Sequence, residues 1–137
     1  MDAIERRLTL PVDLEEAWDL LTRPDDLRGW LGVDVDLQPA PGTRGRVVDH
    51  DGSERRLVVD LVEPGRGIGW VWWSEESPDE ASRVEISLLP AEDGTTVRVL
   101  EELVGATPVA RAQSGEAWSQ RLLHLEALLL VAAAVRG

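Results

Sequence analysis

Residues 67–99 read GIGWVWWSEESPDEASRVEISLLPAEDGTTVRV, a stretch in which apolar residues recur at every second position on both sides of a charged segment. A period of two places alternate side chains on the same face of a β-strand. The pattern predicts strands at Ile68–Trp73, Arg83–Leu89 and Thr95–Leu103. Asp93-Gly94 is a turn dipeptide, so we predict a hairpin between the last two strands.

Further turn residues divide the chain upstream of the tryptophan strand. Asp51-Gly52 separates predicted strands at Arg46–His50 and Glu54–Glu63. Alternation at Val33–Gln38 predicts one more strand. The segment Ser74–Ala81 contains four acidic residues and a proline, so we predict a solvated loop there. Short connections between successive strands are typical of an antiparallel meander.

Helical spacing precedes these strands. A first strand, Ile4–Leu10, ends at Pro11, and Asp13 lies three residues before Glu16, which is the spacing of a capping box. The apolar face of the helix that follows holds Leu14, Ala17, Trp18 and Leu21. Pro24 is suited to the first position of a second, short helix.

A long helix follows the strands, and it starts at either Pro108 or Ser114. Its apolar face holds Trp118, Leu122, Leu125, Leu129 and Ala132. Arg121 and Glu126 interrupt the apolar run well before the roughly 20 residues that a membrane span requires. We therefore predict a buried helix rather than a membrane anchor.

The composition excludes several classes of function. A length of 137 residues predicts one domain, 1–137, and the absence of cysteine excludes disulfides and thiolate nucleophiles. The net charge is −12 and every basic residue is arginine, so the surface repels phosphate backbones and we predict no nucleic-acid partner. The sequence does not open with a basic segment and an apolar run, so we predict a cytoplasmic protein with no membrane partner.

Three motifs occur in a recognisable order. Pro11–Trp30 reads PVDLEEAWDLLTRPDDLRGW, with an acidic cap and two tryptophans. Val62–Trp73 reads VEPGRGIGWVWW, and Ser82–Val99 reads SRVEISLLPAEDGTTVRV, a strand-turn-strand with Asp-Gly-Thr at its turn. Followed by the spaced leucines of Trp118–Leu129, these motifs resemble the activator of Hsp90 ATPase homologue 1-like family, within the START-like (SRPBCC, Bet v 1-like) superfamily.

The resemblance implies an α+β helix-grip fold. In this fold a curved antiparallel sheet of about six to seven strands wraps around a long C-terminal helix, and two short helices follow the first strand. Many relatives bind apolar ligands in a cavity between the sheet and the helix. Because one fold hosts unrelated functions, the resemblance predicts a pocket more directly than a reaction.

Strand alternation and the helical face together predict which side chains face this cavity. The predicted cavity-lining residues are Trp30, Val59, Leu61, Trp70, Trp72, Ile86, Val97, Val99, Glu101, Trp118, Leu122 and Leu125. Trp73 points to the opposite face. The inward indoles either fill the core or line a pocket, and the sequence leaves both open.

Glu101 continues the inward row of Val97 and Val99, and a buried carboxylate must be paired, hydrogen-bonded or neutralised. It either orients a ligand or acts as an acid, or it is wet or paired with an arginine where the strand has frayed or bulged. A third possibility is a hydrogen bond from a Trp N–H or from His124. His124 lies beside the inner stripe of the long helix as a structural histidine, and His50 is predicted to be exposed. No residues have metal-ligand spacing, so we predict no metal and no cofactor.

The leading prediction is a non-catalytic protein that binds a small apolar or amphipathic molecule between the sheet and the C-terminal helix, with a stress-response context implied by the resemblance. Two alternatives stay open. One is a cyclase- or aromatase-like enzyme that uses Glu101 or His124 as general acid or base. The other is an interaction module, either a chaperone partner or a homodimer formed through Leu123, Ala127, Leu130 and Ala134.

Overall fold

The computed structural model describes the backbone of residues 2–103 and 106–136 and the side chains of residues 3–103 and 106–130. Its elements, in chain order, are β1 (Asp2–Leu10), α1 (Leu14–Thr22), α2 (Pro24–Leu27), β2 (Asp34–Asp36), β3 (Arg44–Val48), β4 (Glu54–Glu63), β5 (Gly67–Ser74), β6 (Ser77–Ala91), β7 (Gly94–Leu103) and α3 (Pro108–Arg136). The side chains of Ala132 and Ala134, which were predicted to lie on faces of the last helix, fall outside the described residues.

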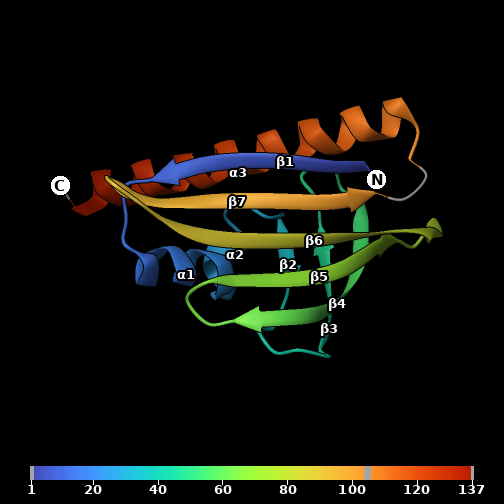
Figure 1. Cartoon of the computed structure of the whole chain (residues 1–137), viewed down its shortest axis with the longest axis horizontal. Coiled ribbons are helices and arrows are strands. Elements are labelled where there is room, and N and C mark those ends of the chain that lie inside the picture. Colours follow the sequence, from blue (N-terminus) through green and yellow to red (C-terminus); the bar gives the residue numbers. More distant parts are fainter. Residues whose placement is uncertain (1, 104–105, 137) are drawn as a thin grey trace.

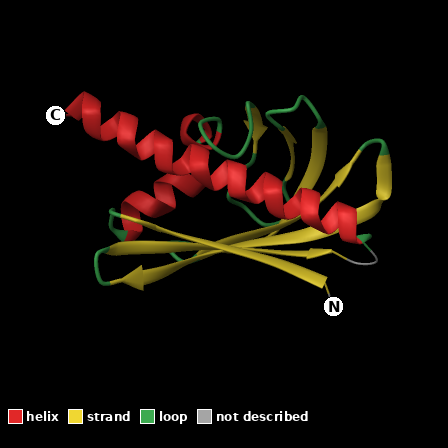
Figure 2. Cartoon of the chain, turned by 90° about the horizontal axis from the view of Figure 1, so that it is seen from above, coloured by secondary structure: helices red, strands yellow, loops and turns green. Residues whose placement is uncertain are grey.

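Seven strands form one antiparallel sheet in the order β1-β7-β6-β5-β4-β3-β2. Strands β2 to β7 form a meander, while β1 pairs with β7, so the connection through α1 and α2 runs between the two edges of the sheet. Figure 1 and Figure 2 show the sheet curving around α3, which crosses one of its faces. This arrangement confirms the predicted helix-grip fold.

The first helix begins where the sequence predicts. Asp13 is its N-cap, and its side chain accepts a hydrogen bond of 2.8 Å from the backbone N–H of Glu16. The buried face of α1 consists of Ala17, Leu20 and Leu21, whereas Leu14 is exposed. The predicted apolar face of this helix includes Leu14, but the side of the helix that packs against the core is centred on Ala17.

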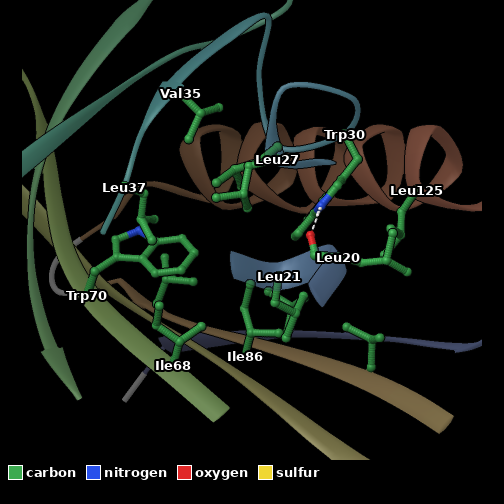
Figure 3. Close-up of a cluster of buried hydrophobic side chains, with 14 of the residues drawn as sticks. Leu20, Leu21, Leu27, Trp30, Val35, Leu37, Ile68, Trp70, Ile86 and Leu125 are labelled. Atoms are coloured by element: carbon green, nitrogen blue, oxygen red, sulfur yellow. Dashed lines mark hydrogen bonds between the residues drawn. The ribbon is translucent and has the colours of Figure 1, made fainter. Parts of the chain in front are cut away.

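The core lies between the concave face of the sheet and the three helices. Ile68, Trp70 and Ile86 from the sheet are buried in the same cluster as Leu21 from α1 and Leu125 from α3 (Figure 3). The predicted inward rows on β5, β6 and β7 are confirmed, and Trp73 is only partly buried, as expected for the outer face. Packed side chains, rather than an empty cavity, therefore occupy the centre of the concave face.

Leu61 does not follow the inward row of β4. The register of β4 against β5 shifts between Val59 and Leu61, which marks a β-bulge at Asp60. Beyond the bulge Val62 packs against the core, while Leu61 lies close to the outward side of Gly69. The prediction of an inward Leu61 was wrong because one extra residue reverses the alternation.

The acidic segment Ser74–Ala81 is not a loop. Ser74 pairs with Ser77, and β6 already begins at Ser77, so the hairpin between β5 and β6 is a tight turn. The side chains of residues 78–81 are exposed. Since these strand residues bury nothing, the segment lacks the apolar alternation by which a strand is recognised in a sequence.

The turn between β3 and β4 also differs from its prediction. Strand β3 ends at Val48, two residues earlier than expected, and the backbone N–H of Asp49 donates to the carbonyl of Ser53 at 2.8 Å. Asp49 therefore closes the hairpin instead of continuing the strand. This position directs its carboxylate toward α3, where it contacts Arg121.

Candidate functional site

A buried carboxylate lies at the centre of the site. Glu101 Oε1 accepts a hydrogen bond of 2.9 Å from Trp118 Nε1, and Oε2 accepts one of 2.8 Å from Trp72 Nε1. The hydroxyl of Ser82 also donates to Oε2, at 2.6 Å. Glu101 is only 2% exposed, so three protein donors replace the water that this carboxylate has lost.

Strand register brings these groups together. Trp72 on β5 pairs with Ser82 on β6, and Glu101 on β7 pairs with Val84, the next inward residue after Ser82. Trp118 enters from α3, and its ring stacks on Trp72 with the ring centres 5.7 Å apart. The prediction that Glu101 points inward is confirmed. Of the alternatives left open for its partners, hydrogen bonding by Trp N–H groups is the one found, joined by a serine hydroxyl, and no arginine in the described residues pairs with it.

Two arginines and one aspartate form a second polar layer beside the indoles. Arg121 donates to Asp49 Oδ1 from Nη2 at 2.7 Å and from Nε at 3.2 Å. Nε of Arg55 lies 3.4 Å from Asp49 Oδ2. The guanidinium of Arg121 lies 4.5 Å from the ring centre of Trp118, and that of Arg55 lies 4.6 Å from the ring centre of Trp72.

A pocket of about 700 Å³ opens above this layer, between the first half of α3, the start of β6 and the turn between β3 and β4. It is lined by Asp49, His50, Asp51, Ser53, Arg55, Ser74, Ser77, Glu80, Ala81, Ser82, Leu103, Ala106, Thr107, Ala110, Gln113, Ser114, Ala117, Gln120 and Arg121. Three helical positions on the pocket wall are alanine or serine, Ala110, Ser114 and Ala117. Their small size leaves the space open where bulkier residues would close it.

None of the predicted cavity residues is among those that line this pocket. Trp30, Val59, Trp70, Ile86, Val97, Val99 and Leu125 are core residues, and Leu61 lies on the outer face. Trp72, Trp118 and Glu101 lie beneath the pocket, because they contact the lining residues Ser82 and Arg121. Leu122 borders a second recess of about 290 Å³, between β1 and α3.

The pocket could have been found by a different signal in the sequence. Ala106, Ala110, Ser114 and Ala117 recur at spacings of three and four in a segment preceding the leucine-rich part of α3. A face of small residues on a helix that otherwise presents large side chains indicates space beside it. The tryptophans are a misleading signal for a pocket, because large side chains fill space more often than they enclose it.

The two histidines lie together at the edge of the pocket. Their rings stack with centres 4.1 Å apart, and Nε2 of His50 is 3.4 Å from the carbonyl oxygen of Trp30. Both residues are exposed, as predicted for His50. The oxygens of Glu101 accept hydrogen bonds from Trp72, Trp118 and Ser82, and no hydrogen bond joins Glu101 to His124.

Fold and site together define a helix-grip domain with a polar-floored pocket beside its long helix. The family model for activator of Hsp90 ATPase homologue 1-like protein matches residues 11–130, so the chain belongs to this family. A comparison with curated proteins gave no match.

Several solved structures share the fold. A Mesorhizobium loti protein is 26% identical with a TM-score of 0.81, over 93% of this chain and 96% of that one. The Aha1 dimer from Colwellia psychrerythraea is 22% identical with a TM-score of 0.78, over 92% and 94% of the two chains. CalU16 from Micromonospora echinospora is 22% identical with a TM-score of 0.73, over 90% and 73%.

Two further findings concern residues 2–103 and 106–136. No helix in this part of the chain combines the length and apolar character needed to cross a bilayer. The same residues contain no group of three His, Asp or Glu side chains arranged to hold a metal ion.

Proposed function

We propose that the protein binds a small amphipathic molecule in the pocket beside the first half of α3, without transforming it. The observation that carries this proposal is a space of about 700 Å³ whose floor is polar and whose helical wall includes the small residues Ala110, Ser114 and Ala117. Such a combination suits a ligand with one polar end and an apolar body. The location differs from the one expected from the sequence, but the kind of ligand is the same.

The arrangement of Glu101 supports binding rather than acid–base chemistry. A general acid or base must reach the substrate within hydrogen-bond distance. Both oxygens of Glu101 accept hydrogen bonds from protein donors, and Ser82 and Trp72 lie between it and the pocket. The cyclase-like alternative needs Glu101 or His124 beside a substrate, and Glu101 is covered by its own partners.

Filling the pocket tests this proposal. Ala110→Phe adds a ring to the pocket wall, and we expect it to weaken ligand binding at least about tenfold because it occupies the volume the ligand needs. Ala112→Phe is the matched control, since Ala112 is exposed on the same helix and does not line the pocket. Binding is measured from the intrinsic tryptophan fluorescence, to which Trp72 and Trp118 beneath the pocket contribute.

The titration uses octanoate, octanamide, cyclohexanecarboxylate and cyclohexanecarboxamide, which do not absorb where tryptophan is excited. Saturable binding that Ala110→Phe abolishes and Ala112→Phe leaves unchanged supports the proposal. If none of the four compounds changes the emission or the thermal midpoint of the wild-type protein, the proposal is wrong for this class of ligand.

A second candidate function, self-association, is favoured by the outer face of α3. Leu123 and Leu130 are 59% and 68% exposed, and Ala127 lies between them on the same helical face. The Colwellia psychrerythraea relative with this fold is described as a dimer. We expect light scattering to give twice the monomer mass, and Leu123→Glu with Leu130→Glu to restore the monomer. A wild-type protein that stays monomeric at high concentration contradicts this second candidate.

A further inference from the structure

Arg55 differs from several other arginines of this protein in how its charge is satisfied. Arg46, Arg83 and Arg98 each donate hydrogen bonds to carboxylates on other strands of the sheet. Arg55 has an ion-pair contact with Asp49, with Nε 3.4 Å from Oδ2, and its side chain makes no hydrogen bond to any residue in the described ranges. Its two terminal nitrogens are therefore available, and Arg55 lines the pocket.

The guanidinium of Arg55 is held in place although it makes no hydrogen bond. It lies over the ring of Trp72, which is itself fixed by hydrogen bonds to Glu101 and Ser82. Stacking on an indole sets the plane of a guanidinium. The side chain is 28% exposed and lines the pocket, so it is partly covered by protein and partly reachable by a ligand.

Two cations and one carboxylate meet at the floor of the pocket. Asp49 is shared between Arg55 and Arg121, so this group of three side chains carries a net charge of +1. The rest of the pocket lining adds the exposed carboxylates of Asp51 and Glu80, so the positive charge is local to the two arginines. Asp51 Oδ1 already accepts hydrogen bonds from the backbone N–H and the hydroxyl of Ser53, at 2.9 and 2.6 Å. The floor of the pocket is therefore a local cationic site in a protein with a net charge of −12.

We propose that the ligand is an amphipathic carboxylic acid, whose carboxylate binds the terminal nitrogens of Arg55. The planar fork of a guanidinium matches the two oxygens of a carboxylate. The apolar body of the acid lies along Ala110 and Ala117 on α3 and Leu103 at the end of β7. This inference rests on the proposed function, because it names the class of molecule that occupies the same pocket.

The charge balance favours a monoanion over a phosphate ester. One carboxylate neutralises the single excess charge of Arg55, Arg121 and Asp49. A phosphate dianion brings a second negative charge close to Asp49 and to the rim carboxylates of Asp51 and Glu80, where no further cation lines the pocket in the described residues. A neutral polar head leaves the Arg55 fork without an anionic partner.

Matched acids and amides test the inference. The probes are octanoate against octanamide and cyclohexanecarboxylate against cyclohexanecarboxamide, which differ in charge but hardly in shape. We expect the wild-type protein to bind each acid about tenfold or more tightly than its amide, because charge-assisted bonds to a guanidinium are stronger than neutral ones. Arg55→Gln should bring the affinity for the acid down to that for the amide.

Two further variants make the assignment specific. Arg55→Lys keeps the charge but loses the planar fork, so it should retain only part of the preference for the acid. Arg44→Gln makes the same change of net charge on β3, away from the pocket lining, and should leave the preference intact. Urea unfolding of each variant checks that a lost preference does not come from a lost fold.

The outcomes separate this inference from the proposed function. The wild-type protein could bind acid and amide with equal affinity while Ala110→Phe still blocks binding. This result overturns the inference that the ligand is a carboxylic acid, and it leaves the proposed binding pocket unaffected. A preference for the acid that survives Arg55→Gln overturns the role of Arg55. Absence of binding by all four probes overturns the inference, and it overturns the proposed function for this class of ligand.

Discussion

Asp49→Ala should destabilise the protein by about 3–5 kcal/mol, because it leaves the charge of Arg121 buried without a partner. The side chain of Arg121 is only 3% exposed, and both of its hydrogen bonds to protein side chains go to Asp49 Oδ1. Removing one member of a buried ion pair costs far more than the pair contributes, since the remaining ion cannot regain its hydration. Urea denaturation at neutral pH measures the change in the free energy of unfolding.

Asp34→Ala is the control for Asp49→Ala. Asp34 also contacts two arginines, Arg46 at 2.9 Å and Arg28 at 3.8 Å, but its side chain is 53% exposed. We expect this change to cost less than about 1 kcal/mol, as for other exposed ion pairs. Adding Arg121→Met to Asp49→Ala should recover part of the loss by removing the isolated charge. Similar costs for Asp49→Ala and Asp34→Ala would falsify the assignment of a buried ion pair.

Glu101→Leu should destabilise the protein by about 3–5 kcal/mol, since it leaves buried donors on Trp72, Trp118 and Ser82 without their acceptor. Glu101→Gln should cost less than Glu101→Leu. An amide offers an oxygen on one side only, so its NH₂ group faces either Trp118 Nε1 or the donors of Trp72 and Ser82. Glu102→Leu, one residue along β7 on the other face, is the control and should change stability by about 0.5 kcal/mol or less.

A pair of tryptophan substitutions checks the same network from the other side. Trp70 and Trp72 are both fully buried on β5, but Trp70 Nε1 has no hydrogen-bond partner within the described chain. Trp72→Phe should therefore cost about 2 kcal/mol more than Trp70→Phe, because only the first breaks bonds to a buried carboxylate. Equal costs in urea unfolding would mean that Glu101 does not depend on the indole donor.

Much of the sheet follows directly from local patterns. The alternation of Ile68, Trp70 and Trp72, and of Val97, Val99 and Glu101, correctly predicted which side chains are buried. Asp93-Gly94 predicted the hairpin between β6 and β7, where Ala91 pairs with Gly94. These features depend only on residues close together in the chain, so a sequence pattern is enough to predict them.

Departures from the predictions occur where a neighbouring strand determines local structure. The bulge at Asp60 turns Leu61 away from the core, and no residue in β4 signals it. The paired but exposed start of β6 looks like a loop because nothing there is buried. Pairing between strands stabilises both features, and pairing leaves little trace in the alternation of a single strand.

The sequence by itself determined the order of the elements, the fold, the inward rows of the sheet and the burial of Glu101. Tertiary structure alone decided what that carboxylate meets and where the pocket lies. Arg121 and Asp49 are 72 positions apart in the chain, and Arg55 reaches the same aspartate from the next strand. Tryptophans fill the concave face, and the space remains beside the small residues of α3. A pocket is the volume that packing leaves unfilled, so it depends on all the surrounding elements at once.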